Sequence, residues 1–242
     1  MRKSLVAAAI VAASTATSAC GQAHSKDGGP TVSRNFQVGS FDEVVSAGAY
    51  DVTIRTGSAP SVSARGPQKA LEHMVVEVRN GKLEIHPEKQ NNWFHRVNYR
   101  GKVEVTVTVP QLKGATLAGA GDMRVDKIQG DSFDGTLAGA GNLQVDSIQV
   151  QTLKLTIAGA GDARLGAGTA QTADYSIAGA GDMDAKGVAV QQAKVAIAGS
   201  GSVSAHVSTT ADVSIVGAGD VEVAGGAKCN VHKLGAGDVR CS

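Results

Sequence analysis

The sequence predicts an all-β fold, a single-stranded parallel β-helix (β-solenoid) with coils of roughly 18–20 residues. Three observations support this prediction. A short glycine turn, first seen as LAGAGDMRVD at residues 117–126, occurs seven times along the chain. The residues on both sides of each turn alternate between apolar and polar, which is typical of half-buried strands. Aromatic residues make up only 3% of the chain while glycines number 31, a composition that suits stacked small repeats.

The first 33 residues are predicted to lie outside this fold. Arg2 and Lys3 precede a short alanine-rich apolar run, so residues 1–19 are interpreted as a secretory signal peptide. The sequence TSAC at 17–20 resembles a bacterial lipobox, and we predict that Cys20 is lipidated. Thr17 departs from the leucine usual at that place, so ordinary cleavage nearby is the alternative. Residues 20–33 are polar and contain the glycines and serines of a flexible tether.

The β-helix itself is expected over residues 34–242, beginning with irregular coils at 34–112. Alternating strand patterns occupy residues 50–57, 60–66, 74–87 and 101–110, but these lack the GAGD turn. Asn80-Gly81 predicts a hairpin-like turn, and the ALEHM segment suggests one short helical turn. We expect these segments to form early, less regular coils that cap the solenoid.

Regular coils are expected over residues 113–242. The opening glycines of successive turns are spaced by twenty residues four times and then by eighteen twice. One strand enters each turn and one leaves it, with Ile, Leu, Val and Ala facing an apolar interior. Coils of this kind stack ~4.8 Å apart.

The glycine turns are interpreted as corners of the coils, because glycine accepts backbone angles that other residues avoid. A dinucleotide-binding loop would need a third glycine and a following helix, whereas Arg124 and a strand follow the first turn. The predicted structural turn residues are Gly119, Gly121, Asp122, Gly139, Gly141, Asn142, Gly159, Gly161, Asp162, Gly179, Gly181, Asp182, Gly217, Gly219, Asp220, Gly235, Gly237 and Asp238.

The last residue of each turn motif is predicted to align in a ladder of mostly aspartates. Two carboxylates ~4.8 Å apart repel by roughly 1 kcal/mol in water and about 3–4 kcal/mol at a surface-like dielectric. Asn142 and Ser202 interrupt the row. We therefore favour aspartates that accept hydrogen bonds from turn N–H groups, and expect neither a metal nor another cofactor. A row of calcium sites is the alternative, although calcium-binding repeats have a nine-residue period.

Two cysteines near the C-terminus predict a disulfide. With Cys20 lipidated, Cys229 and Cys241 remain as a pair in an oxidising compartment. The repeat places both at inward positions of the last coil, so we expect a bond that clamps this coil and closes about 13 residues. Two buried thiols are the alternative. Lys233 stands where an inward isoleucine is expected and indicates a frayed coil.

The segment at residues 88–101 breaks the smooth pattern. It contains three of the eight aromatic residues, beside a histidine and two arginines. We predict a protruding loop that can act in recognition, since loops on rigid scaffolds often bind partners and Trp, Tyr and Arg are frequent at interfaces. Alternatively, the aromatic residues cap an open end of the solenoid, or the loop is disordered. The candidate binding residues are Trp93, Phe94, His95, Arg96, Tyr99 and Arg100.

Three segments together resemble a known family. FDEVVSAGAYDVTIRTG, VEVRNGKLEI and VEVTVTVPQLKGATLAGAGD, with the later repeats, resemble the head GIN domain, a family described as autotransporter adhesins, over roughly residues 34–240. The resemblance implies a right-handed parallel β-helix, often in secreted or lipoprotein-like bacterial proteins. The family has no established catalytic residues to assign here.

The expected function is that of a non-enzymatic cell-envelope lipoprotein, an adhesion or binding scaffold. Removal of Arg2 and Lys3 with the signal leaves 21 Lys and Arg against 22 Asp and Glu, which argues against a nucleic-acid binder. The sequence contains no HExxH, CxxC or GxSxG motif, so we assign no catalytic or metal-binding residues. A β-helix enzyme acting on polysaccharides is one alternative, but no pair of carboxylates stands out from the repeat.

A periplasmic structural or regulatory subunit is the other alternative. The expected partners are the membrane, through the lipid, and an envelope or host-surface ligand that the sequence does not identify. Gly21 follows the lipid cysteine in place of the aspartate associated with inner-membrane retention, which favours the outer membrane.

Overall fold

The computed structural model describes residues 28–57, 59–88 and 101–242. The signal peptide, Cys20 and the six candidate loop residues from Trp93 to Arg100 lie outside the described residues and stay predictions. Within the described ranges the chain is almost entirely β-strand, as predicted, with a single short helix, α1 (Gln68–Glu72). No helix in these ranges is long and apolar enough to cross a membrane.

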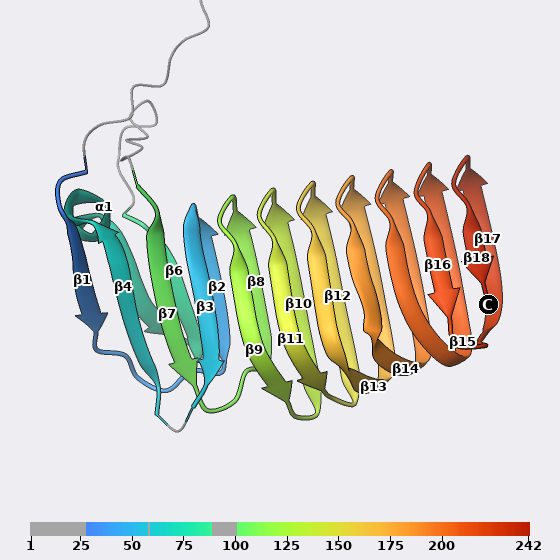
Figure 1. Ribbon diagram of the computed structural model, residues 1–242, viewed down its shortest axis with the longest axis horizontal. Helices are drawn as coiled ribbons and strands as arrows, with labels where there is room; N and C mark the ends of the chain where they lie inside the picture. The colour runs from blue at the N-terminus through green and yellow to red at the C-terminus, as the bar shows by residue number, and fades with distance from the viewer. Residues whose placement is uncertain (1–27, 58, 89–100) are drawn as a thin grey trace, which may run out of the picture.

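The molecule is an elongated stack of coils built from two opposed layers of strands (Figure 1). In the first layer, strands run towards the glycine turns, at the upper edge of Figure 1, and in the second they run away from them. The first layer contains β2 (Glu43–Gly48), β8 (Gly114–Gly119), β10 (Ser132–Gly139), β12 (Thr152–Gly159) and β17 (Lys228–Gly235). The second contains β3 (Tyr50–Thr56), β9 (Met123–Gln129), β11 (Leu143–Gln149), β16 (Val221–Ala224) and β18 (Val239–Cys241).

Three long strands belong to both layers. They are β13 (Ala163–Gly179), β14 (Met183–Gly199) and β15 (Val203–Gly217), and each passes through the corner opposite the glycine turns. Their first halves continue the second layer, and their second halves continue the first.

Parallel pairing between coils follows the repeat of the sequence. Strands β10 and β12 pair Leu137 with Ile157 and Gly139 with Gly159, so each residue lies beside its equivalent twenty positions away. Alternate residues face the interior and are buried, which removes their apolar surface from water. One such inward row contains Val125, Val145, Leu165, Ala185, Ala205 and Val223.

The N-terminal region is arranged differently from the expected succession of coils. Strand β2 pairs with β8 on one side and with β6 (Lys82–Pro87) on the other, while β3 lies between β9 and β7 (Val103–Val109). The first coil therefore lies inside the stack rather than at its end. The expectation that 34–112 lacks the glycine turn is also wrong in part, because Gly48 pairs with Gly119 and has a φ of +142°.

The end of the stack is closed by antiparallel strands. Strand β4 (Ser61–Pro67) pairs antiparallel with β1 (Thr31–Phe36) and with β7, and β5 (Met74–Arg79) pairs antiparallel with β6. The predicted turn joins β5 to β6, with φ of 50° at Asn80 and 77° at Gly81, as a tight hairpin of this kind requires. Helix α1 includes part of the ALEHM segment.

Candidate binding groove along the aspartate ladder

The glycine turns allow the corners of successive coils to approach closely. Gly159 has a φ of +143°, and a Cβ at this position would lie closer than 3.0 Å to the carbonyl oxygen of Gly139. Gly161 has an ordinary φ, but a Cβ there would crowd the carbonyl oxygen of Gly141 in the same way. The first glycine is therefore needed for both its conformation and its size, and the second for its size alone.

The ladder side chains connect one coil to the next. In each contact a backbone N–H of a ladder residue donates to the Oδ1 of the ladder aspartate one coil earlier. Asp182 donates in this way to Asp162 at 2.9 Å, and Ser202 donates to Asp182 at 2.9 Å. The same bond joins Asn142 to Asp122 at 3.1 Å and Asp238 to Asp220 at 2.8 Å. The aspartates thus accept from turn N–H groups of the neighbouring coil.

The ladder begins earlier than the sequence predicts. The backbone N–H of Asp122 donates to Asp51 Oδ1 at 3.1 Å, so Asp51 is the first ladder residue. The signal is present in the sequence as AGAYD at 47–51, where Tyr50 replaces the second glycine of the turn. This replacement is what hides the motif.

Hydrogen bonding and sequence interruptions both reduce the repulsion between stacked carboxylates. Each N–H donated to a carboxylate forms a charge-assisted bond, which is stronger than a bond between neutral groups. The side-chain amide of Asn142 adds a hydrogen bond, which Nδ2 donates to Asp122 Oδ1 at 2.8 Å. Within the described residues, the only three His, Cys, Asp or Glu side chains whose ligand atoms converge are Glu77, Glu84 and His86, which lie outside the ladder.

A shallow groove of about 620 Å³ runs beside the ladder across several coils. One margin consists of ladder residues, and the other of the outward side chains that follow them on the second layer. Its polar lining residues are Asp51, Thr53, Asp122, Arg124, Asn142, Gln144, Asp162, Arg164, Asp182 and Asp184. The groove thus presents hydrogen-bond donors and acceptors repeated at the spacing of the coils, ~4.8 Å.

Charges on the same face are largely paired across coils. Arg124 forms an ion pair with Asp146, with Nη2 2.8 Å from Oδ2, and Arg164 Nε lies 3.7 Å from Asp184 Oδ2. Lys186 bonds Glu222 at 2.7 Å, and this hydrogen bond lowers the pKa of the Glu222 carboxyl while raising the pKa of Lys186. These exposed pairs contribute little to stability individually, and the groove lining, with five aspartates and two arginines, stays acidic.

Replacing Asp182 tests the structural role of the ladder. Asp182→Ala removes the acceptor of the Ser202 N–H, and we expect the free energy of unfolding to fall by about 1–2 kcal/mol. Asp182→Asn keeps a side-chain oxygen that can accept this hydrogen bond and should cost less. Chemical denaturation measures both, with Glu104→Ala, a change at an exposed carboxylate on β7, as the control. Equal stability of Asp182→Ala and the control would contradict the assignment.

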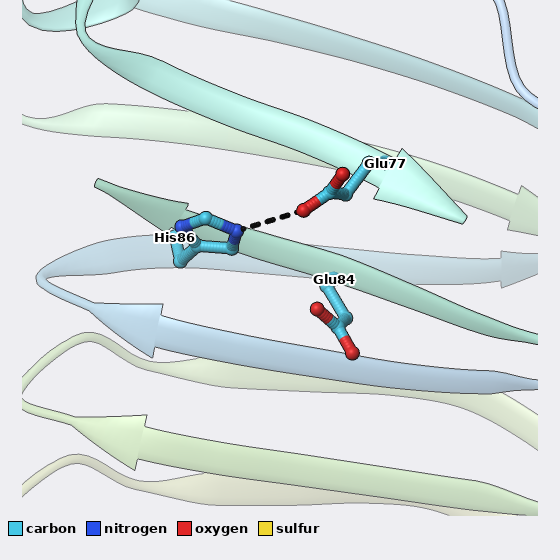
Figure 2. Close-up of side chains that lie close together, drawn as sticks. All are labelled: Glu77, Glu84 and His86. Carbon is cyan, nitrogen blue, oxygen red and sulfur yellow. Dashed lines mark hydrogen bonds and ion pairs between the residues drawn. The ribbon is translucent and has the colours of Figure 1, made fainter. Parts of the chain in front are cut away.

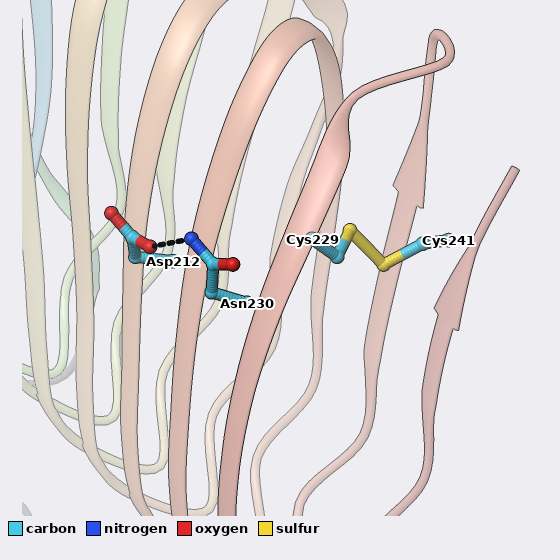
Figure 3. The surroundings of a disulfide bond; sticks show 4 residues. All are labelled: Asp212, Cys229, Asn230 and Cys241. Carbon is cyan, nitrogen blue, oxygen red and sulfur yellow. Dashed lines mark hydrogen bonds between the residues drawn. A yellow bond between two sulfur atoms is a disulfide. The ribbon is translucent and has the colours of Figure 1, made fainter.

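The C-terminal coil ends the stack with a disulfide (Figure 3). Cys229 pairs with Ala211 and Cys241 with Val223, which are the inward positions expected from the repeat. Their sulfur atoms are bonded at 2.05 Å. Cys229 is half-buried and packs against the core, as expected, whereas Cys241 is exposed, so the expectation of a buried position holds for Cys229 only in part and is wrong for Cys241.

Lys233 occupies the position equivalent to Ile215 in this last coil. Its side chain is exposed, and Nζ donates to the carbonyl oxygen of Gly237 at 2.6 Å. A charged residue at an inward position of an edge strand discourages the addition of another strand. A lysine at this position therefore suits the last coil of the stack.

Comparison with known proteins identifies both family and fold. A family model described as "Putative auto-transporter adhesin, head GIN domain" matches residues 40–227. A "putative adhesin" from Bacteroides fragilis has a similar structure, with a TM-score of 0.80 at 21% identity, covering 88% of this chain and 97% of that one. A "putative lipid binding protein" from Parabacteroides distasonis gives a TM-score of 0.70 at 21% identity, with the same shares of the two chains covered.

A "putative adhesin" from Parabacteroides merdae gives a TM-score of 0.69 at 20% identity, covering 89% of this chain and 98% of that one. No curated protein matches the sequence.

Proposed function

We propose that this chain is a non-catalytic binding scaffold of the cell envelope. It belongs to the head GIN domain family, whose description is "Putative auto-transporter adhesin". In this proposal Cys20 carries the lipid that anchors the protein, and the tether at 20–33 separates the solenoid from the membrane. Gly21, next to this cysteine, favours placement in the outer membrane. The ligand is an extended polysaccharide that lies along the groove beside the aspartate ladder.

The groove is the observation that supports this proposal. It follows the long axis of a stack whose coils are locked together by parallel pairing and by the ladder hydrogen bonds. Repeated polar groups at fixed spacing match a polymer that carries repeated hydroxyls. A scaffold that is already ordered loses little conformational entropy when it binds such a chain.

A polysaccharide-cleaving enzyme is less well supported by the same residues. Catalysis of this kind requires an acid and a base whose carboxyl groups face one scissile bond. Asp162 and Asp182 instead each accept a backbone hydrogen bond from the next coil. Their positions are explained by the stacking of the coils, so we assign them no catalytic role.

A charge-reversal experiment tests the groove. Arg124→Glu combined with Arg164→Glu changes two groove residues, while Lys154→Glu combined with Lys194→Glu makes the same charge change on the opposite layer. The purified proteins are applied to an array of bacterial and host polysaccharides. We expect the groove variant to lose at least tenfold in affinity and the opposite-layer variant to bind as the unchanged protein does.

Two results would contradict the proposal. One is the absence of binding to every polysaccharide on the array. The other is an equal loss of binding in both double variants, which would indicate a general effect of charge rather than recognition in the groove.

A further inference from the structure

The outer face of the β5–β6 hairpin brings together two carboxylates and a histidine (Figure 2). Glu77 lies directly opposite Glu84 in the antiparallel register. Like charges in this relation destabilise a sheet unless a cation compensates them. Among the described residues the side chain of Glu84 has no hydrogen bond or ion pair, so no protein cation compensates its charge there.

The histidine beside them has a defined tautomer. Nδ1 of His86 lies 2.9 Å from the carbonyl oxygen of Pro87, which can only accept a hydrogen bond. Nδ1 therefore carries a hydrogen, and in the neutral ring the lone pair is on Nε2. Histidine ligands of metals are commonly oriented by such a bond from the other ring nitrogen to a backbone carbonyl.

The lone pair of Nε2 is directed at a carboxylate. Nε2 lies 3.3 Å from Glu77 Oε1. Two acceptors facing each other at this distance repel, so either a proton or a metal ion belongs between them. A charge-assisted N–H···O bond is normally about 2.7–2.9 Å long, whereas two ligands of a tetrahedral zinc ion, each at ~2.0–2.1 Å from the metal, lie about 3.3–3.4 Å apart. The separation of 3.3 Å fits a hydrogen bond from a protonated ring, and it is also wide enough for two ligands of one zinc ion.

We propose that Glu77, Glu84 and His86 form a binding site for a divalent transition-metal ion of the zinc class. The ligands are one carboxylate oxygen from each glutamate and Nε2 of the histidine, and these atoms all lie within 4.8 Å of one another. Three protein ligands leave a fourth position for water or for a group of a bound partner. The imidazole favours zinc over calcium or magnesium, which prefer oxygen ligands alone.

Neighbouring cations compete with the metal only weakly. Arg79 Nη2 lies 2.8 Å from Glu77 Oε1, but its side chain is 62% exposed and can move into solvent. Lys82 is engaged by Glu43 at 2.6 Å. His86 and Glu77 are only 23% and 30% exposed, so the site is partly shielded while one side stays open to water.

Zinc binding is measured by isothermal titration calorimetry on the tag-free protein with ZnCl₂. All samples carry Cys20→Ser, which removes the one cysteine outside the disulfide. We expect one zinc ion per chain and at least tenfold weaker binding of calcium and magnesium. His86→Ala and Glu84→Gln should each weaken zinc binding at least tenfold. His232→Ala, at the other end of the solenoid, should leave it unchanged.

A second measurement separates metal binding from protonation and from misfolding. Nitrogen-15 NMR of the histidine rings reports directly on Nε2 of His86 in the folded, unsubstituted protein. We expect this resonance to shift on addition of zinc at neutral pH. A doubly protonated His86 whose signal zinc leaves unchanged would overturn the proposal, as would zinc binding that is equal in all variants or absent.

Discussion

Gly159→Ala is expected to lower the free energy of unfolding by about 4 kcal/mol or more, the largest effect of any single change considered. A side chain at its φ of +143° costs about 1–3 kcal/mol. Its Cβ would also clash with the carbonyl oxygen of Gly139 in the preceding coil. This oxygen belongs to the backbone and cannot move aside as a flexible side chain could. Overpacking of this kind costs typically 1–3 kcal/mol, occasionally more.

Three further glycines separate the two contributions. Gly161→Ala introduces the backbone clash without an unusual φ, and Gly226→Ala introduces an unfavourable φ of +79° with no atom within 4 Å of the new Cβ. Gly39→Ala introduces neither and serves as the control. Urea denaturation should rank the losses with Gly159 first and Gly39 last. A Gly159→Ala protein as stable as the Gly39→Ala protein would contradict the assigned role of the turn.

Removal of the terminal disulfide is expected to have the second largest effect, confined to the last coil. A loop of about this length contributes roughly 3 kcal/mol when it is closed in the unfolded chain, and the cysteines are 12 positions apart. In a solenoid each coil is stabilised mainly by its neighbours, and this coil has a neighbour on one side only. In the double variant Cys229→Ser, Cys241→Ser, β17 and β18 should therefore open most readily.

Hydrogen exchange of backbone amides measures this effect. Faster exchange is expected in β17 and β18, with β12 and β13 nearly unchanged. Reduction of the disulfide in the unsubstituted protein should reproduce the pattern, which controls for the substituted side chains. Exchange that accelerates uniformly across all coils would show that the bond stabilises the whole solenoid instead.

The regular coils could be predicted because every coil repeats the same turn motif and the same alternation of apolar and polar residues. The spacing of Gly139, Gly159 and Gly179 fixes the parallel register, and the alternation of side chains fixes which face is buried. The family resemblance supported the same fold. The donors of the ladder hydrogen bonds could not be predicted. The sequence indicates that the aspartates accept hydrogen bonds at the turns, but it does not show that each donor belongs to the next coil.

The arrangement of the N-terminal strands could not be predicted in the same way. Alternation identifies β3, β4 and β7 as strands but does not say which of them are neighbours or whether they are parallel. The position of β2 between β6 and β8 depends on contacts between segments far apart in the chain. Tyr50 in place of a turn glycine also hid the correspondence between the first coil and the later ones.

The Glu77, Glu84 and His86 cluster was missed although its signal is present. A two-residue turn at Asn80-Gly81 pairs residue 79 with 82, and therefore Glu77 with Glu84. His86 lies two residues further along the same face. Nine positions separate Glu77 from His86 in the chain, and only the fold-back across the hairpin brings them together, so spacing along the sequence alone does not indicate the cluster.

Exposure of the domain on intact cells tests most directly the central claim that the proposed binding scaffold faces outward from the cell envelope. Cells are treated with a protease shown to cut the purified domain, and the domain is then followed by immunoblotting. We expect cleavage without lysis, while a periplasmic marker protein stays intact. Full protection of the domain until the outer membrane is broken would contradict an outward-facing adhesin and leave a scaffold that acts in the periplasm.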